Sequence, residues 1–258
     1  MIKAALLGRD ISYTLSPEIH AAIAAAVGEE LKFDVVDVPY DALDAEVGKL
    51  LAEYDGFFIT KPYKNDVKRF LKSYPANCGV NFVSCADGRG YNTDGIGFMR
   101  ALEASFGKVD GKIKSALVLG AGGAAHSVSE ALIQAGINVY VLNRTALTAA
   151  KMCTALGPNA QMYFNQPAEL IVNCTSVGLH NDDVLTALCV LPDFKYAFDL
   201  IYNPPVTPFL RRCEAAGART ANGLDMLIYQ AIEGDKILFG RDINVPQVYE
   251  AVRKALNG

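Results

Sequence analysis

Short apolar runs alternate with helical patterns along most of the chain. The apolar runs predict strands at residues 2–7, 33–38, 56–60, 116–119, 138–142, 170–174 and 196–200. The helical patterns predict helices at residues 17–27, 43–51, 66–71, 96–106, 126–134, 208–216, 224–238 and 246–256. Strands that alternate with helices pair in parallel through crossovers, so we expect an α/β protein with mainly parallel sheets.

One segment interrupts this alternation. Residues 81–86 and 91–92 are separated by Asp87-Gly88-Arg89-Gly90, and an Asp-Gly pair between apolar runs favours a hairpin. The glycine-containing residues 107–111 are the expected seam between two domains. We expect a first domain of residues 1–100 and 235–258, with the C-terminal helices packing back on it, and a second domain of residues 101–234.

The predicted strand at 116–119 leads directly into Gly120-x-Gly122-x-x-Ala125, and a helix and a second strand follow. A dinucleotide pyrophosphate requires this order of elements. Gly120 permits the tight turn, Gly122 lets the backbone approach the phosphates, and the small Ala125 lets helix and strand pack closely. The helix N-terminus then offers free N–H groups to the anion. The second domain is therefore predicted to be a Rossmann domain.

The residues after the second strand distinguish the two nicotinamide cofactors. An NAD site usually has Asp or Glu there to bind the ribose 2′-hydroxyl, whereas this chain has Asn143-Arg144-Thr145. A guanidinium pairs with a 2′-phosphate through charge-assisted hydrogen bonds, so Arg144 favours NADP. The alternative is that Arg144 is a solvated side chain at the start of a helix capped by Thr145.

Composition narrows the range of functions. The 258 residues are 51% hydrophobic and 20% charged with a net charge of −4, and no cluster of lysine and arginine is long enough for a nucleic-acid partner. The cysteines form no Cys-x-x-Cys pair and indicate a reducing compartment, and the histidines lie far apart, so we expect no disulfide framework and no metal site. These residues are Cys78, Cys85, Cys153, Cys174, Cys189 and Cys213, and His20, His126 and His180.

No segment reaches the roughly 18 apolar residues that a membrane span needs, and the N-terminus lacks the features of a signal peptide. We therefore expect a cytoplasmic protein with no membrane partner. Its expected ligands are small molecules, and the sequence leaves a monomer and a homodimer equally open.

A nucleotide site needs a substrate site beside it, and polar segments follow two of the first-domain strands. Thr14 and Ser16 lie between the first strand and its helix, and Thr60 to Lys64 follow the third strand, where open parallel sheets present ligands. The alternatives are that Ser16 caps the helix beginning at Pro17 and that the lysines are solvated surface charges.

Polar residues also flank the predicted hairpin. Asn81 lies at its start, and Asn92-Thr93-Asp94-Gly95 follow it, in otherwise apolar surroundings. Asp94 is suited both to a catalytic role and to capping the helix that begins at Ile96, and the sequence alone leaves both open.

Through these same segments the sequence resembles the shikimate dehydrogenase family, including its shikimate/quinate dehydrogenase relatives. The resemblance runs nearly from end to end of the chain. It rests on Leu15-Ser16-Pro17-x-x-His20, Thr60-x-Pro62-x-Lys64, Val80-Asn81, Asn92-Thr93-Asp94-Gly95-x-Gly97, the Gly-Ala-Gly-Gly-Ala-Ala run from Gly120, Asn143-Arg144-Thr145, Asn173-x-Thr175-Ser176-x-Gly178, Tyr202-Asn203-Pro204 with Thr207-Pro208-Phe209-Leu210, and Asn222-Gly223-Leu224-x-Met226-Leu227-x-x-Gln230.

The resemblance implies that the first domain binds substrate and that the enzyme reversibly reduces 3-dehydroshikimate to shikimate with NADPH, in chorismate and aromatic amino acid biosynthesis. It implies that Lys64 and Asp94 form the catalytic pair. The implied substrate-binding residues are Thr14, Ser16, Thr60, Lys64, Asn81, Asp94, Tyr202 and Gln230. The implied cofactor-binding residues are Gly120, Ala121, Gly122, Gly123, Ala124, Asn143, Arg144, Thr145, Thr175, Ser176, Leu200 and Gly223.

Four positions depart from the pattern of the family. The chain has Thr14 where the family generally has Ser, Phe58 where it has Asn, Phe82 where it has Thr, and Thr148 where many NADP-dependent members have a second Arg. The first three leave open a paralogue that prefers quinate or a related hydroxylated cyclohexane carboxylate, and the fourth leaves open some use of NAD. A nucleotide-binding regulatory protein without catalysis is a third hypothesis, against which the presence of both Lys64 and Asp94 argues.

Overall fold

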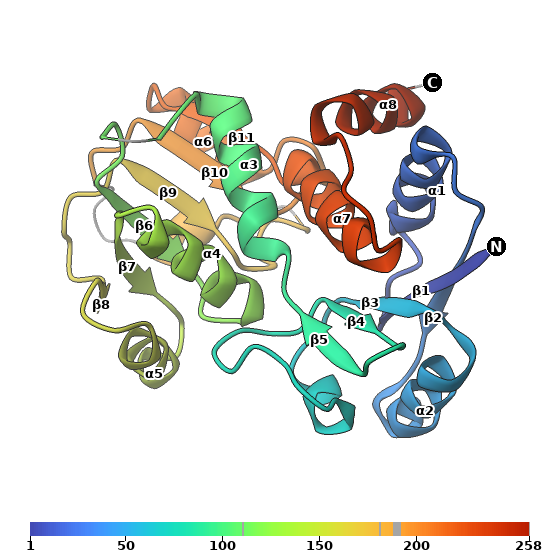
Figure 1. The fold of residues 1–258 in the computed structure, drawn as a ribbon. Coiled ribbons are helices and arrows are strands. Elements are labelled where there is room, and N and C mark those ends of the chain that lie inside the picture. The colour runs from blue at the N-terminus through green and yellow to red at the C-terminus, as the bar shows by residue number, and fades with distance from the viewer. Residues whose placement is uncertain (110, 181, 188–191, 258) are drawn as a thin grey trace. The chain divides into compact units, whose positions relative to one another are not determined.

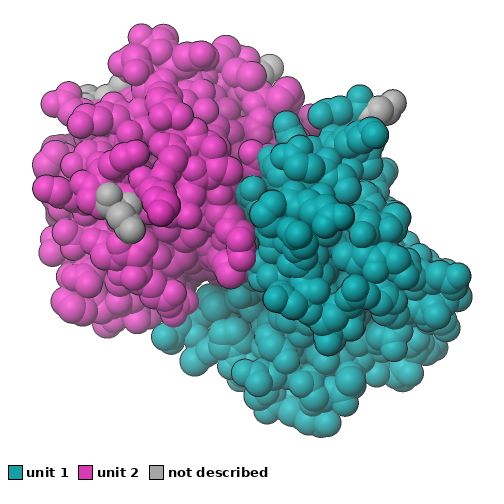
Figure 2. Space-filling model, turned by 45° about the horizontal axis from the view of Figure 1, so that its top comes forward, with its two compact units in different colours: residues 1–93, 228–258 teal, residues 94–227 magenta. Residues whose placement is uncertain are grey.

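The computed structural model describes residues 1–109, 111–180, 182–187 and 192–257; Cys189 lies outside these ranges. The chain forms two compact units (Figure 1). Unit 1 comprises residues 1–93 and 228–258, and unit 2 comprises residues 94–227, as coloured in Figure 2. The chain passes between the units at the start of helix α3 (Asp94–Phe106) and inside helix α7 (Leu224–Leu238), and the predicted boundaries at residues 100 and 234 fall later in the same two helices.

Unit 1 is built on a five-stranded sheet in the order β2-β1-β3-β4-β5. The first three strands pair in parallel and the last two are antiparallel, so the sheet is mainly parallel, as predicted. The strands are β1 (Ile2–Gly8), β2 (Leu31–Asp37), β3 (Gly56–Ile59), β4 (Phe82–Ser84) and β5 (Arg89–Tyr91). The helices are α1 (Ser16–Val27), α2 (Leu43–Glu53), the greater part of α7, and α8 (Val245–Asn257), with short 3-10 helices η1 (Tyr40–Ala42) and η2 (Asp66–Phe70).

Apolar side chains cover both faces of this sheet, because alternate residues of a strand point to opposite faces. Leu7 and Ile59 belong to the core cluster under α2, whereas Leu6 and Phe58 belong to a second cluster that includes residues of α7. Figure 1 accordingly shows α2 on one side of the sheet and α1, α7 and α8 on the other. Helix α8 packs against α1, which confirms that the C-terminal helices return to the first domain.

Two local predictions in unit 1 need correction. The hairpin turn comprises Cys85 to Gly88, and β5 already begins at Arg89, because residues 89–91 pair with β4 in register. The helix predicted at 66–71 is the shorter 3-10 helix η2.

Unit 2 is built on a six-stranded, fully parallel sheet in the order β11-β10-β9-β6-β7-β8. The strands are β6 (Ser115–Leu119), β7 (Asn138–Leu142), β8 (Ala160–Met162), β9 (Leu170–Asn173), β10 (Tyr196–Asp199) and β11 (Arg219–Ala221). Helices α3, α4 (Gly123–Gln134), α5 (Ala146–Leu156) and α6 (Pro208–Ala215), with the 3-10 helix η3 (Val184–Ala187), complete it. Counted from β6, this is the 3-2-1-4-5-6 order of the dinucleotide-binding fold, with its reversal between β6 and β9.

The residues that the structure describes were also compared with the requirements of membrane spans, metal sites and disulfides. None of their helices combines the length and apolar character that a membrane span requires. No three His, Cys, Asp or Glu side chains within them group as metal ligands. The cysteines that they contain, Cys78, Cys85, Cys153, Cys174 and Cys213, are free thiols.

Candidate active site

The carboxyl ends of β1 and β3 lie side by side where the strand order of the unit-1 sheet reverses. A β-carbon on Gly8, the last residue of β1, would lie 2.6 Å from Cγ2 of Thr60, the residue after β3. Thr60 N also donates a hydrogen bond to Leu7 O (2.9 Å), and Arg9 N donates one to Lys61 O (3.2 Å). Open parallel sheets bind ligands in the crevice at such a reversal, so the segments after β1 and β3 form the candidate substrate site.

Thr14 and Ser16 place two hydroxyl groups on the connection from β1 to α1. Thr14 Oγ1 donates a hydrogen bond to Ser16 Oγ (3.0 Å) and accepts one from the Ser16 amide (3.2 Å). The N-cap residue of α1 is Leu15, and no side chain caps the helix. The interpretation of Ser16 as a capping residue is therefore wrong, because its hydroxyl bonds to the Thr14 side chain instead.

Lys64 lies on the connection after β3, close to the start of β4. A β-carbon on Gly79 would lie 2.9 Å from the Lys64 β-carbon, and the Val80 amide donates to the Lys64 carbonyl oxygen (2.7 Å). The neighbouring Tyr63 is fully buried, and its hydroxyl donates to the Val38 carbonyl oxygen (2.6 Å). The backbone that bears Lys64 is therefore fixed on both sides.

Asn81 and Gln230, which lie far apart in sequence, meet in a largely buried hydrogen-bond network. Asn81 Nδ2 donates to Gln230 Oε1 (3.0 Å) and to Thr93 Oγ1 (2.8 Å), and the Thr93 amide donates to Asn81 Oδ1 (2.8 Å). Thr93 Oγ1 in turn donates to the Gln230 carbonyl oxygen (2.8 Å). Sequence reasoning did not select Thr93 as a site residue; its only signal was its place in the Asn92–Gly95 segment.

The remaining predicted substrate-site residues belong to unit 2. Asp94 is buried, and α3 begins there rather than at Ile96 as predicted. Tyr202 is half-buried on the connection that follows β10. Lys64 thus belongs to unit 1 and Asp94 to unit 2, so the catalytic pair that the resemblance implies stays a prediction.

The glycine-rich segment of unit 2 lies at the reversal between β6 and β9. Gly120 follows β6 with a φ of +108°, and a β-carbon there would lie 3.0 Å from Thr175 Cγ2 and 3.3 Å from the Cys174 backbone. The Gly120 amide donates to the Leu142 carbonyl oxygen at the end of β7 (2.7 Å). Gly120 and Thr175, predicted from separate motifs, are therefore neighbours, and Ser176 lies exposed beside them.

Gly122 is the N-cap residue of α4, and no side chain caps this helix. A β-carbon on Gly122 would have no neighbour among the described atoms within 4 Å, so packing inside the protein does not require glycine at this position. The first N–H groups of a helix have no partner within the helix and favour an anion. Ala125 is fully buried. Gly122, with Ala121, Gly123 and Ala124 around it, thus fits a dinucleotide pyrophosphate.

Asn143, Arg144 and Thr145 follow β7, the strand next to β6. Asn143 Nδ2 donates to the Thr145 carbonyl oxygen (3.0 Å), and Arg144 is exposed. Thr145 is the N-cap residue of α5, but its side chain makes no capping hydrogen bond, so that interpretation is wrong for the side chain. An exposed guanidinium at this strand end fits a 2′-phosphate. Thr148 is also exposed, in the first turn of α5.

A second network orders the loops after β9 and β10, and sequence reasoning missed its centre. Asp199 accepts hydrogen bonds from Asn173 Nδ2 (3.0 Å), Ile201 N (3.0 Å) and Thr207 Oγ1 (2.6 Å). Asn173 Oδ1 also accepts from the Thr175 amide (3.0 Å) and hydroxyl (2.7 Å). Burial raises the pKa of Asp199 to about 6, despite these donors. The network therefore fixes Thr175 and the Leu200 segment.

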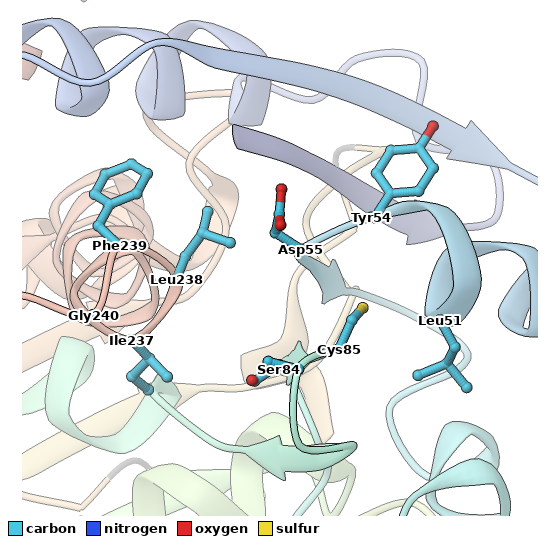
Figure 3. A pocket seen from close by; sticks show the side chains of 10 residues that line it. Leu51, Tyr54, Asp55, Ser84, Cys85, Ile237, Leu238, Phe239 and Gly240 are labelled. Carbon is cyan, nitrogen blue, oxygen red and sulfur yellow. The ribbon is translucent and has the colours of Figure 1, made fainter. Parts of the chain in front are cut away.

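A separate hollow of about 390 Å³ lies at the opposite ends of β3 and β4 (Figure 3). Tyr54, Asp55, Ser84, Cys85 and the end of α7 line it. Burial raises the pKa of the Cys85 thiol to about 12, so this cysteine is a poor nucleophile. None of the predicted site residues lines this hollow.

Known proteins resemble this chain over nearly its whole length. Residues 6–78 match the family described as the shikimate dehydrogenase substrate binding domain. The shikimate dehydrogenase (NADP(+)) of Thermus thermophilus is 34% identical over 99% of this chain and 99% of its own length, and that of Methanococcoides burtonii is 32% identical over 98% of both. The crystal structure of the Thermus thermophilus shikimate 5-dehydrogenase in complex with NADP(H) and shikimate matches with a TM-score of 0.86 and 32% identity, over 99% of this chain and 100% of that one. An Ael1 enzyme from Pseudomonas putida matches with a TM-score of 0.87 and 28% identity, over 98% of both chains.

Proposed function

The chain belongs to the shikimate dehydrogenase family, and we propose that it catalyses the reversible, NADP-dependent reduction of 3-dehydroshikimate to shikimate. The observation that carries the proposal is that the strand order reverses once in each sheet, between the parallel strands β1 and β3 and between the parallel strands β6 and β9. Ligands bind at such reversals. The crevice of unit 1 has hydroxyl, amide and ammonium groups that suit a polyhydroxylated carboxylate. The crevice of unit 2 has a glycine-rich loop that suits a pyrophosphate.

The cofactor supplies or accepts a hydride at its nicotinamide when bound. Gly120, Gly122 and the N-terminus of α4 would hold its pyrophosphate, and Arg144 would pair with the 2′-phosphate. Thr175, Leu200 and Gly223 lie on the neighbouring strand ends and would complete the site.

The substrate site needs donors for a carboxylate and paired donors and acceptors for ring hydroxyls. Thr14 and Ser16 supply hydroxyls suited to the carboxylate, and the buried Asn81 with the half-buried Gln230 supplies an amide network suited to the hydroxyls. Thr60 and Tyr202 are the further groups proposed to bind the ring. The side chains therefore carry the hydrogen-bonding groups that the roles implied by the resemblance require.

Lys64 and Asp94 are proposed to move the proton. Negative charge develops on the carbonyl oxygen of the substrate as the carbonyl carbon is reduced. The Lys64 ammonium stabilises this charge and donates the proton, and the neutral amine accepts it in the reverse direction. Asp94 orients the ammonium and helps to relay protons.

The test is an oxidation assay with shikimate and quinate, each with NADP⁺ and NAD⁺. We expect the highest kcat/KM for shikimate with NADP⁺. A preference for quinate would support the paralogue hypothesis and would implicate Thr14, Phe58 and Phe82 in the choice of substrate. If neither acid were oxidised with either cofactor, the proposed function would be wrong and a non-catalytic nucleotide-binding role would remain.

Three further expectations accompany this function. The enzyme contributes to the biosynthesis of aromatic amino acids, it is cytoplasmic, and it is a monomer or a homodimer without nucleic-acid or membrane partners. Each stays a prediction.

A further inference from the structure

A buried acid and a buried histidine join helices α1 and α7 of unit 1. His20 Nδ1 lies 2.8 Å from Asp235 Oδ2, and the two side chains are 1% and 0% exposed. The other carboxylate oxygen of Asp235 is buried without a hydrogen-bond partner in the described residues. A carboxylate is costly to bury, and here His20 is the partner of the Asp235 carboxylate. We therefore expect the pair to tolerate little change in the distance between α1 and α7.

The His20 ring packs in a layer of aromatic side chains. The His20 ring stacks on Phe33, with centroids 4.4 Å apart and an interplanar angle of 13°, and its centroid lies 4.1 Å from that of Phe58. Phe58 also contacts Phe82, at 4.8 Å between centroids. A β-carbon on Gly234 would lie 2.4 Å from the Phe58 ring, so the ring occupies its place only because residue 234 is glycine.

Three members of this layer lie one structural repeat from residues of the candidate substrate site. His20 is one helical turn after Ser16 on α1, and Gly234 is one turn after Gln230 on α7. Phe58 precedes Thr60 by two residues in and just beyond β3, so the two side chains point to the same face. His20, Phe58 and Gly234 therefore form a supporting layer next to Ser16, Thr60 and Gln230, and Asp235 joins this layer through its contact with His20.

We propose that His20 and Asp235 are positioning residues, which fix α1 against α7 and so set the distance between the Ser16 hydroxyl and the Gln230 amide. This inference rests on the proposed function. Apolar packing alone would let the two helices slide, whereas a buried hydrogen bond between two polar groups has one favourable geometry. Neither residue needs to touch the substrate. The His20 ring contacts Phe58, so a shift of His20 also displaces β3, to which Phe58 belongs.

The experiment compares the steady-state kinetics of Asp235→Ala and Asp235→Asn with those of the unaltered enzyme, using shikimate and NADP⁺. Asp235→Ala leaves the buried His20 without its partner, so we expect the KM for shikimate to rise about tenfold or more. Asp235→Asn keeps the shape and one acceptor, so we expect a rise of about threefold. The KM for NADP⁺ should stay within about twofold in both variants, because the layer belongs to unit 1.

Arg241→Gln is the matched control. Arg241 contacts Glu29 (3.2 Å) and the Val27 carbonyl oxygen (3.4 Å), so it also links the end of α7 to the end of α1, but at an exposed position. Its loss should leave the KM for shikimate unchanged.

The outcomes separate this inference from the proposed function. A purely structural role would lower the folded fraction, which reduces the apparent kcat and leaves both KM values unchanged; that result would overturn the inference. Equal rises of both KM values would also overturn it. If Asp235→Ala does not fold, the KM values of Asp235→Asn decide in the same way. Failure of the unaltered enzyme to oxidise shikimate would instead contradict the proposed function.

Discussion

Gly223 lies directly against the backbone of Leu200: a β-carbon on Gly223 would be 2.0 Å from the Leu200 carbonyl oxygen and 2.5 Å from its carbonyl carbon. Leu200 follows β10 and Gly223 precedes α7, so the contact joins two connections at the carboxyl end of the unit-2 sheet. The Gly223 amide also donates to the Ile201 carbonyl oxygen (3.2 Å). Glycine is required here by close approach of the backbone, and both residues belong to the proposed cofactor site.

Gly223→Ala should destabilise the protein. The new methyl group would overlap a backbone carbonyl that cannot rotate away, so we expect the free energy of unfolding to fall by about 3 kcal/mol. Urea denaturation without cofactor measures this loss. Gly48→Ala is the control, because Gly48 is exposed in α2 with open space around it, and it should stabilise the protein by about 0.5–1 kcal/mol. Equal effects of the two substitutions would show that the contact does not require glycine.

Asp199 should make the stability of the protein depend on pH. Burial raises its pKa to about 6 from a usual value of 3.8, so the folded state binds the proton more tightly than the unfolded state. The contribution of Asp199 to the free energy of unfolding therefore falls as the pH rises from about 4 to about 6, by about 2–3 kcal/mol, and stays constant above that range.

Asp199→Asn removes this titration. The free energy of unfolding of the variant, relative to the unaltered protein, should increase by the same amount between pH 4 and pH 7, as measured by urea denaturation across this range. Asp182→Asn, at an exposed position, is the control for the loss of one carboxylate. Parallel pH profiles for Asp199→Asn and the unaltered protein would show that Asp199 does not titrate in this window.

Elements of the fold could be predicted from the sequence where the residues that form them follow one another closely along the chain. The strand, glycine turn and helix around Gly120 need only each other, so the pattern at 115–134 identified them together. The strand order of unit 2 agrees with the Rossmann domain that the glycine motif predicted. The packing of α8 on α1 agrees with the expectation from the length and apolar character of the C-terminal helices. β8 and β11 were missed because each has three residues, too few for an alternating pattern, and neither lies beside an Asp-Gly turn like the one that indicated the hairpin of β4 and β5.

Other residues escaped prediction because their partners are distant in sequence. Asp235 meets His20 across 215 positions, and Thr93 meets Gln230 across 137. No local pattern indicates which buried acid will find a histidine on another helix. Ser16 shows the opposite error: its position before a proline favoured a cap, but the neighbouring Thr14 hydroxyl offered a nearer partner.

Arg144 should determine the preference for NADP. Arg144→Gln removes the charge that would pair with the 2′-phosphate, so the KM for NADP⁺ should rise about 10- to 100-fold while the KM for NAD⁺ stays nearly constant. Thr148→Arg should lower the KM for NADP⁺, because a second guanidinium would lie in the first turn of α5. Lys151→Gln, farther along the exposed side of α5, is the control for net charge and should change neither value. A rise in both KM values with Arg144→Gln would argue against specific phosphate recognition.

Lys64 carries the most direct test of the proposed chemistry. Lys64→Met keeps the length and apolar part of the side chain but removes the ammonium, so kcat for shikimate oxidation should fall by about 10²- to 10⁴-fold, with a smaller change in the KM for NADP⁺. Lys61→Met is the matched control from the same connection, since Lys61 is exposed and its amine lies 5.8 Å from the centre of the Tyr13 ring. Removing that charge should leave kcat within about twofold, because an exposed cation–π contact contributes little. Near-normal turnover by Lys64→Met would exclude this lysine as the group that exchanges the proton with the substrate oxygen. If Lys61→Met lowered kcat as much as Lys64→Met, the positive charge of the whole connection, rather than one positioned amine, would support the reaction.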